Sequence, residues 1–173
     1  FRYMAAFEPR FEEGILVIHR NGNNFVLLGN ECYGLFHECK VPVSPLLCQI
    51  LSLPNQPMDR FTSMKEMFEK AGLENGMRIG VVGWKLFIGN MDTDHMFDVP
   101  AYIIKALTEI TGEIDVVNVT GIFINPRDGI RTINEVHAIA QLEYGAAQAS
   151  GRIADMLDGL EPGKPEMELG AYL

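Results

Sequence analysis

The sequence predicts a mixed α/β fold in which short strands lead into alternating helices and strands. Three observations support this expectation: β-branched runs near the start of the chain, apolar residues at helical spacing further on, and a composition that is 47% hydrophobic and 21% charged. Such a composition excludes a disordered or collagen-like chain. With 173 residues, the chain is long enough to bury one core of ordinary size.

A β-hairpin is predicted first. Residues 14–20 and 25–28 are rich in β-branched and aliphatic side chains, which is typical of strands. The intervening residues 21–24 are Asn-Gly-Asn-Asn, which tolerate the positive φ angles of tight turns. A third strand is predicted at about residues 47–52, beside the hairpin, because Pro42 and Pro45 interrupt the apolar stretch before it.

An amphipathic helix is predicted from Asp59 to Gly72, where glycine favours a left-handed stop. Ser63 and Glu66 have the spacing of a capping box, in which each side chain bonds the other residue's backbone N–H. The apolar stripe of this helix consists of Phe61, Met64, Met67, Phe68 and Ala71.

A strand, a loop, a second helix and another strand are predicted next. Residues 78–82 are expected to form a short buried strand, and the loop at 83–97 is long for a connector. Asp98 is placed to cap the next helix, and Gly112 ends it. The apolar face of this helix consists of Val99, Ile103, Leu107 and Ile110. Residues 114–119 give one more strand.

The order of these elements predicts a mixed sheet with flanking helices. The sheet would begin as an antiparallel meander and continue through crossover helices, an order that is ribonuclease H-like in outline. A long helix follows, since residues 133–157 keep an apolar stripe for about seven turns, some 40 Å in length. Gly145 and Gly151 each cost about 1 kcal/mol of helix stability, so we expect a kink or break within residues 144–151.

The end of the chain indicates a second region. The only plausible domain boundary lies at residues 125–131, and Pro165 is placed to begin a further short helix. Because the chain begins at Phe1 and stops at Leu173 within a helical pattern, we expect both ends to be cut from a longer chain.

Charge and cysteine content restrict the partners and the compartment. Lys and Arg number 14 against 23 Asp and Glu, so the formal charge is −9, which repels phosphate backbones and anionic lipids. We therefore expect no nucleic acid and no membrane as partners. The three cysteines are an odd number with no disulfide framework, which favours a reducing, cytoplasmic location.

Two groups of possible metal ligands have unsuitable spacing. Zinc sites use thiolates and imidazoles, but Cys32, His37, Cys39 and Cys48 contain no Cys-x-x-Cys pair, so buried or idle thiols are the favoured interpretation. Residues 92–95, Asp-Thr-Asp-His, lack the glycine turn and distal glutamate of a calcium loop, so a solvated loop is favoured.

Other catalytic patterns are also incomplete. Gly80 and Gly83 follow a predicted strand, where glycines can cradle a phosphate, but a dinucleotide fingerprint needs Gly-x-Gly-x-x-Gly at the start of a helix and an aromatic loop follows instead. A two-metal nuclease needs several carboxylates at the ends of its strands. The predicted central strands carry almost none, and Asp115 is the exception. The four histidines, His19, His37, His95 and His137, occur in no nucleophile motif. The residues alone thus predict a folded domain without an assembled active site.

The chain resembles the amino-terminal domain of the creatinase, prolidase and aminopeptidase P superfamily, whose catalytic domain has the "pita-bread" fold. Residues 3–7 resemble the family's Tyr-Leu-Thr-Gly-Phe segment, with Ala5 and Ala6 as departures. The hairpin at 15–28 and the strand at 75–81 are similar to the segments that follow. Residues 127–136 resemble the entry to the linker helix, where Glu135 matches and the usual Lys is replaced within residues 132–134.

The most specific similarity lies at the end of the chain. Residues 153–169 resemble the segment that opens the catalytic domain, with Pro162, Gly163, Glu166 and Leu169 in place. Pro165 departs from the usual Thr or Ser. The departures suggest a divergent member of the superfamily.

The resemblance implies that residues 1–126 are the non-catalytic amino-terminal domain, without its first strand and helix, and that residues 127–173 are a linker helix and the start of a truncated catalytic domain. It implies a proline-specific metallopeptidase, an Xaa-Pro aminopeptidase or dipeptidase, with two divalent ions of manganese, cobalt or zinc in the missing domain. No family ligand position falls within this sequence, so we assign no catalytic, cofactor or metal residue and expect the chain alone to be inactive.

The resemblance also implies that this domain supports a homodimer, rests against its own catalytic domain and limits access to short proline-containing peptides. The loop with Trp84, Phe87 and His95 is the candidate for the access or interface role, although packing of Trp84 and Phe87 on the sheet edge is the stronger alternative. Two alternatives remain for the whole protein: a metal-free scaffold or binding module, and a creatinase-like amidinohydrolase. In the isolated fragment, an apolar face of the long helix that is normally covered would be exposed, so we expect this fragment to self-associate.

Overall fold

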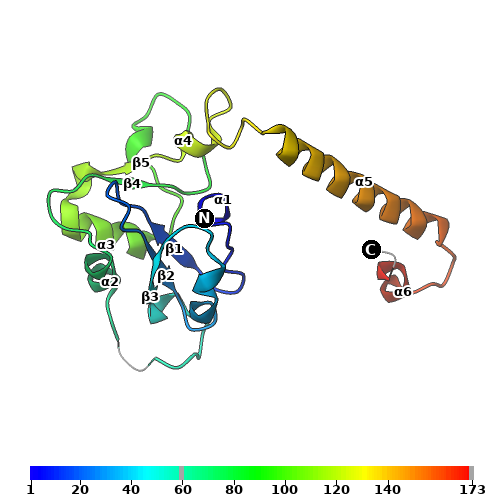
Figure 1. Ribbon diagram of the computed structural model, residues 1–173, viewed down its shortest axis with the longest axis horizontal. Coiled ribbons are helices and arrows are strands. Elements are labelled where there is room, and N and C mark those ends of the chain that lie inside the picture. Colours follow the sequence, from blue (N-terminus) through cyan, green and yellow to red (C-terminus); the bar gives the residue numbers. More distant parts are fainter. Residues whose placement is uncertain (59–60, 172–173) are drawn as a thin grey trace. The chain divides into compact units, whose positions relative to one another are not determined.

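The chain forms two compact units, which cover residues Phe1–Ile130 and Arg131–Leu173 (Figure 1). A computed structural model describes residues 1–58 and 61–171, so the predicted helix start at Asp59 lies outside the described residues. The division of the chain into an amino-terminal domain and a catalytic fragment stays a prediction. Each unit is described by itself.

The first unit contains a three-stranded mixed sheet in the order β1-β2-β3. Strand β1 (Gly14–Val17) is antiparallel to β2 (Phe25–Leu28), with Gly14 opposite Leu28, which confirms the predicted hairpin. In the turn between them, Gly22 has a φ of 84° and Asn23 donates its backbone N–H to Asn21 Oδ1 over 3.0 Å. Glycine adopts this left-handed conformation at little cost.

The third strand differs from the prediction in position and direction. Strand β3 covers Ser44–Leu47 and runs parallel to β2, whereas Gln49–Leu51 form a short 3₁₀ helix, η2. Pro45 pairs with Val26 inside this strand. Because β3 is at the edge of the sheet, the missing N–H of proline interrupts no further ladder. The chain reaches β3 through a 3₁₀ helix, η1 (Tyr33–Glu38), so the predicted antiparallel meander is wrong.

Strand β2 is central and buried on both faces. Successive side chains of a strand point to opposite faces. Leu27 therefore belongs to the main core cluster, whereas Val26 and Leu28 belong to a second cluster with Ala5 and Cys32. The short helix α1 (Arg2–Ala5) and η1 contribute to that second cluster. The continuous apolar run of β2 thus reflects burial on two sides.

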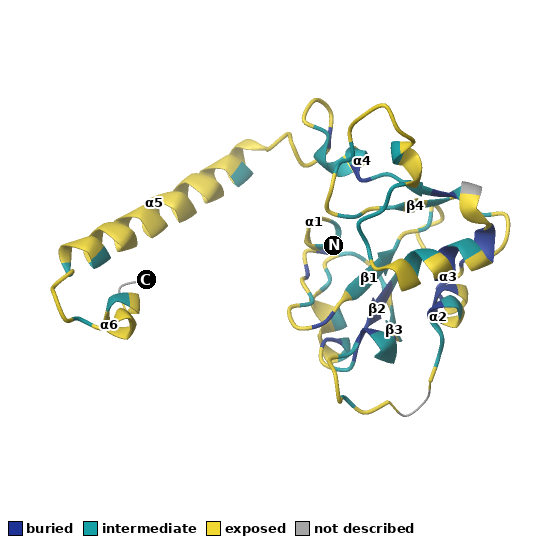
Figure 2. Cartoon of the chain, turned by 180° about the vertical axis from the view of Figure 1, so that it is seen from behind, coloured by how far each residue is buried: buried dark blue, intermediate teal, exposed yellow. Residues whose placement is uncertain are grey.

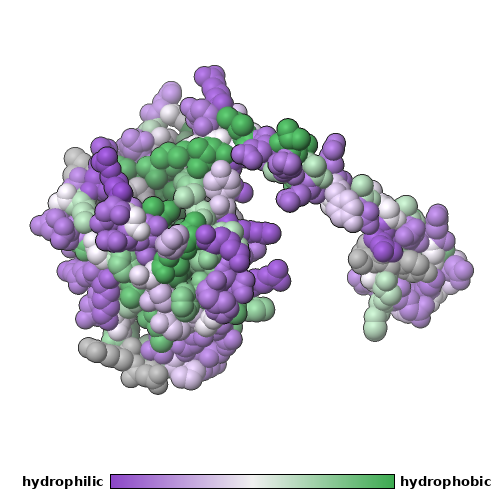
Figure 3. Space-filling view, in the orientation of Figure 1, coloured by the Kyte–Doolittle hydropathy of each residue, from purple (hydrophilic) through white to green (hydrophobic). Residues whose placement is uncertain are grey.

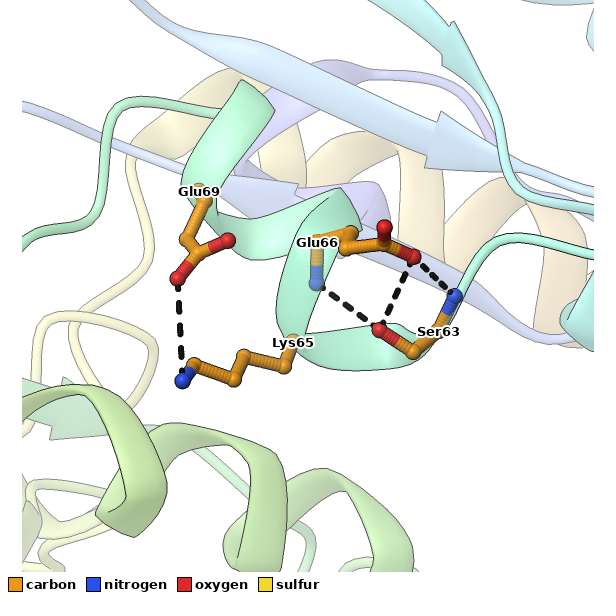
Figure 4. Close-up of polar contacts among 4 residues, drawn as sticks. All are labelled: Ser63, Lys65, Glu66 and Glu69. Atoms are coloured by element: carbon orange, nitrogen blue, oxygen red, sulfur yellow. Dashed lines mark hydrogen bonds and ion pairs between the residues drawn. The ribbon is translucent and has the colours of Figure 1, made fainter.

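Helix α2 (Met64–Lys70) has the predicted capping box (Figure 4). Glu66 N donates to Ser63 Oγ over 3.2 Å, and Ser63 N donates to Glu66 Oε2 over 2.8 Å. The helix begins later than expected: Phe61 lies before it and is 73% exposed, so it is not part of the buried stripe. Gly72 follows the helix with a φ of 82°, as predicted.

Helix α3 (Ala101–Thr111) packs against α2 and buries Ala106, Leu107 and Ile110. The prediction that Asp98 caps this helix is wrong, because the N-cap residue is Pro100 and it makes no side-chain cap hydrogen bond. Asp98 instead accepts a hydrogen bond from the backbone of the preceding loop.

A second, two-stranded sheet pairs β4 (Ile79–Val81) with β5 (Val116–Asn118) in parallel. Both strands were predicted, but the prediction of a single sheet is wrong. In the described residues, no hydrogen-bonded ladder joins β4 or β5 to the sheet β1-β2-β3. Val116 and Leu27 nevertheless belong to one core cluster, so both sheets share it. A Cβ at Gly80 would lie 2.7 Å from Val119 Cγ2, so this glycine permits close packing. The 3₁₀ helix η4 (Glu113–Asp115) precedes β5, and α4 (Gly121–Ile124) follows it.

The buried carboxylate of Glu12 connects the loops around the first sheet through hydrogen bonds. Glu12 is 8% exposed, and its carboxylate accepts backbone N–H groups from Glu31, Cys32 and Leu53 at 3.0, 3.1 and 3.3 Å. Hydrogen bonds to an ionised group are stronger than neutral ones. One side chain therefore holds two loop segments that are distant from it in sequence.

The second unit consists of α5 (Val136–Asp158) and α6 (Glu166–Gly170). Helix α5 is continuous, so the predicted break at residues 144–151 is absent, and the alanines and leucine around the two glycines favour the helix. None of its residues is buried (Figure 2). Among the helices of the described residues, none combines the length and apolar character that crossing a bilayer requires.

Candidate functional site

The candidate site is the loop between β4 and α3, which we call the β4 loop (residues 82–98). Its two ends are held by polar groups that follow the carboxyl ends of the parallel strands. Gly83 N donates to the buried Thr120 Oγ1 over 2.8 Å, and Asn118 Nδ2 donates to Met96 O over 2.6 Å. The base of the loop is therefore fixed to β5 and its extension.

Asp98 closes the loop across its base. Trp84 N donates to Asp98 Oδ2 over 2.9 Å, which joins the two ends of the loop directly. The other carboxylate oxygen, Asp98 Oδ1, is buried and has no hydrogen-bond partner within the described residues. A side chain at Gly83 would collide with this carboxylate, so glycine is required for the close approach.

The β4 loop presents large apolar side chains to solvent. Trp84 is 89% exposed, Ile88 is 84% exposed and Met91 is 64% exposed. Figure 3 shows hydrophobic surface on the first unit in the region where Figure 1 places β4, β5 and α4. Exposed apolar groups that are gathered on one segment indicate a contact surface.

The three residues singled out from the sequence have different environments. The indole of Trp84 is exposed, so it does not pack on the sheet edge, whereas Phe87 is half-buried with Lys85 Nζ 5.4 Å above its ring centre. His95 belongs to a short 3₁₀ helix, η3 (Thr93–His95). His95 also lines a shallow groove beside α3 with Phe97, Ile104 and Lys105, whereas neither Trp84 nor Phe87 lines it.

His95 and Asp92 form a hydrogen-bonded pair at the surface. The distance from His95 Nδ1 to Asp92 Oδ2 is 2.7 Å. This hydrogen bond lowers the pKa of the Asp92 carboxyl below its usual value. The pair therefore orients the imidazole and keeps the carboxylate ionised, but it lies in an exposed loop rather than in an enclosed pocket.

The described residues do not form a metal centre. No group of three or more His, Cys, Asp or Glu side chains in that part of the chain is placed to hold an ion. Cys32 and Cys48 are buried and Cys39 is half-buried. Burial raises the pKa of the Cys48 thiol to about 11, which disfavours the thiolate that metals and electrophiles require. The resemblance places its two divalent ions in a domain outside these residues, and that expectation stays a prediction.

Sequence reasoning missed the residues that anchor the β4 loop. Asn118 lies in a predicted strand and Thr120 directly after it, but neither was given a role. Asp98 was assigned to a helix cap. Polar residues directly at the end of an apolar strand were the available signal, because such positions lie at a sheet edge where loops meet.

Comparison with solved structures finds an Xaa-Pro dipeptidase from Bacillus anthracis, with a TM-score of 0.57 and 15% sequence identity. The similarity covers 99% of this chain and 39% of that chain, so this chain spans less than half of the dipeptidase. At this identity the similarity shows the fold: a mixed α/β arrangement compatible with part of a prolidase-like protein. No family model matches the chain, and no curated protein matches its sequence.

Proposed function

We propose that this chain is the non-catalytic amino-terminal domain of a proline-specific metallopeptidase, an Xaa-Pro aminopeptidase or dipeptidase. The observation that carries the proposal is the structural similarity over 99% of this chain to 39% of an Xaa-Pro dipeptidase. The domain would be of the ribonuclease H-like, creatinase amino-terminal type. It would lead into the catalytic domain through α5.

In this proposal the chemistry belongs to a catalytic domain outside the described residues. That domain would hold two divalent ions of manganese, cobalt or zinc. Because the resemblance assigns no ligand position to this sequence, the ligands and the catalytic step would come from that domain. The net charge of −9 supports a protein without nucleic-acid or anionic-lipid partners. The three cysteines without a disulfide framework support a cytoplasmic location.

We further propose that the β4 loop limits access to the active site and takes part in the homodimer. Two observations support this role: Thr120 and Asn118 anchor the base of the loop at Gly83 and Met96, and the Trp84 side chain is exposed. An apolar obstacle of this kind would favour short proline-containing peptides over long ones, because longer substrates would have to pass it.

The proposal is tested on the native full-length protein by metal content and by hydrolysis of an Xaa-Pro dipeptide and a longer Xaa-Pro peptide, with and without added manganese. We expect bound divalent metal and metal-dependent cleavage. Cleavage of the dipeptide alone would indicate a dipeptidase, and cleavage of the longer peptide an aminopeptidase. A protein that holds no metal and cleaves neither peptide would overturn the proposal. That result would favour the scaffold or the creatinase-like amidinohydrolase.

The loop's role is tested by Trp84→Ala in the same protein. This substitution removes the indole but keeps the backbone N–H that bonds Asp98. We expect the ratio of long-peptide to dipeptide cleavage to rise by roughly threefold or more. Phe11→Ala is the matched control, because Phe11 is 70% exposed but lies outside the loop. An equal ratio in both variants and the parent would remove the access role.

A further inference from the structure

Two asparagines of this chain are followed directly by glycine: Asn21 precedes Gly22, and Asn75 precedes Gly76. The first pair lies in the turn between β1 and β2, and the second lies in the turn between α2 and β4. Both pairs are exposed, and both glycines have a left-handed φ of 84°. The two turns therefore match in sequence, exposure and glycine conformation, and they differ in their hydrogen bonds.

An Asn-Gly pair can modify itself with water as the only co-reactant, because glycine has no side chain to keep its backbone nitrogen away from the asparagine amide. The glycine nitrogen loses its proton and attacks the asparagine Cγ, so that a new C–N bond closes a succinimide ring. The bond between Cγ and the amide nitrogen breaks, and this nitrogen leaves as ammonia after taking up a proton. Water then opens the ring at either carbonyl, which gives aspartate or isoaspartate.

The turn between β1 and β2 holds both reacting groups of the first pair. Gly22 N donates its hydrogen to His19 O over 3.0 Å, so the proton that the reaction must remove is in a hydrogen bond. Asn21 Oδ1 accepts the backbone N–H of Asn23 over 3.0 Å, which fixes the side-chain amide group. The bond from Gly22 must break before its nitrogen can lose the proton and attack. The folded state therefore protects the first pair.

The turn between α2 and β4 holds neither reacting group of the second pair. This turn is closed by a hydrogen bond from Met77 N to Glu74 O over 3.3 Å, which involves neither group. Within the described residues, Gly76 N and the Asn75 side chain have no hydrogen-bond partner. A Cβ at Gly76 would meet no atom within 4 Å apart from its chain neighbours, so the ring has room to close.

The Asp-Gly pairs of the chain, which can close the same ring with loss of water, are held in the manner of the first Asn-Gly pair. Their glycines are Gly129 and Gly159. Gly129 N donates to Asn125 O over 2.8 Å, and Gly159 N donates to Asp155 O over 3.1 Å. Among the glycines that follow Asn or Asp, Gly76 is thus the one whose nitrogen forms no hydrogen bond in the part of the chain that the structure describes.

From this contrast we propose that Asn75 is a site of spontaneous deamidation in the folded protein, whereas Asn21 is protected. The product carries an additional negative charge beside Glu69 and Glu74, which line the same shallow pocket as Asn75 and Lys65. In the isoaspartate form, the main chain also passes through the side-chain Cβ and gains a methylene group. The modification therefore changes both the charge and the length of the turn that joins α2 to β4.

Peptide mapping by mass spectrometry tests this site in the native full-length protein, independently of any peptidase activity. The protein is incubated at mildly alkaline pH, because the attacking nitrogen must lose its proton. Deamidation replaces an amino group by a hydroxyl group and raises the peptide mass by that difference. We expect it at Asn75 at least about fivefold faster than at Asn21, the factor that one hydrogen bond supplies. Both aspartate and isoaspartate should form, since the ring opens at either carbonyl.

Unfolding and two matched variants complete the test. In concentrated urea, which removes the hydrogen bonds of both turns, Asn21 and Asn75 should react at similar rates. Asn75→Gln should abolish the modification at this position, because glutamine must close a larger ring, and Asn21→Gln should leave the rate at Asn75 unchanged. Equal rates at the two sites in the folded protein, an Asn75 that stays intact while the urea sample reacts, or a product without isoaspartate would overturn the proposal.

Discussion

Helices α3 and α5 show how similar sequence patterns lead to different environments. Both carry an apolar stripe at helical spacing, and α3 buries four of its 11 residues against α2 and the sheets. Helix α5 has 23 residues and buries none. The pattern specifies a helix and the face that requires cover, but only the rest of the structure determines whether that face is covered. Unit 1 is therefore held by its core, whereas the described residues of unit 2 contain no buried core of their own.

The largest expected contrast is between matching truncations in the two units. Phe68 on α2 is 2% exposed, so Phe68→Ala should lower the free energy of unfolding by about 3–5 kcal/mol through lost burial and a cavity. Leu142 on α5 is 65% exposed, so Leu142→Ala should change it by less than about 0.5 kcal/mol in dilute, monomeric samples. Urea unfolding followed by circular dichroism measures both. Equal effects would contradict the contrast.

A smaller but distinct loss is expected from the buried carboxylate of unit 1. Glu12→Gln keeps the shape but removes the charge that accepts three backbone N–H groups, and turns an amide NH₂ toward those donors. The free energy of unfolding should fall by about 2 kcal/mol. Glu8→Gln is the control, because Glu8 forms an exposed ion pair with Arg2 that contributes about 0–1 kcal/mol. Urea unfolding measures both variants. An unchanged urea midpoint in Glu12→Gln would show that the Glu12 carboxylate does not stabilise these loops.

Local signals predicted the elements that depend on local chemistry. The structure confirms the hairpin, the Ser63–Glu66 capping box and strands β4 and β5. These elements were predictable because turn residues, caps and apolar runs act over only a few residues. The position and direction of strand β3 and the division into two sheets were not predicted, because strand pairing is a long-range property. Pro45 argued against a strand, and only the edge position of β3 removes that objection.

The candidate site was predictable in its location and not in its anchors. A long aromatic loop after a strand indicated where to look, and Trp84 is indeed exposed. The hydrogen bonds from Gly83 to Thr120 and from Trp84 to Asp98 join residues 37 and 14 positions apart. No local pattern encodes such contacts, so Asp98 was assigned to the nearest helix instead.

Helix capping gives a further comparison between the units. Ser63 caps α2 through both hydrogen bonds of its box, whereas Glu135 makes no side-chain cap hydrogen bond at the start of α5. Ser63→Ala should therefore destabilise unit 1 by about 1 kcal/mol. Glu135→Ala, the matched control, should leave the unfolding of unit 1 unchanged. Thermal unfolding followed by circular dichroism checks both, and an equal shift in the two variants would argue against a specific cap.

The smallest expected effect is confined to alkaline pH and involves Tyr102 on α3. Its hydroxyl donates to Glu13 Oε2 over 2.7 Å, and partial burial, followed by the nearby Glu13 carboxylate, raises the pKa of the phenol. In the unfolded chain this phenol loses its proton near pH 10, whereas the folded state retains it. A folded pKa above the unfolded one gives stability that is present below about pH 10 and is lost as the pH rises further.

The pH dependence of unfolding above about pH 10 should thus become less steep in Tyr102→Phe, which has no ionisable proton at this position. Tyr144 on α5 is 69% exposed and lies in unit 2, so Tyr144→Phe should leave the alkaline slope of unit 1 as it is in the parent. Urea midpoints measured at several pH values between neutrality and the alkaline limit test both variants. A slope that Tyr102→Phe does not reduce would show that this long-range contact does not couple α3 to the start of β1.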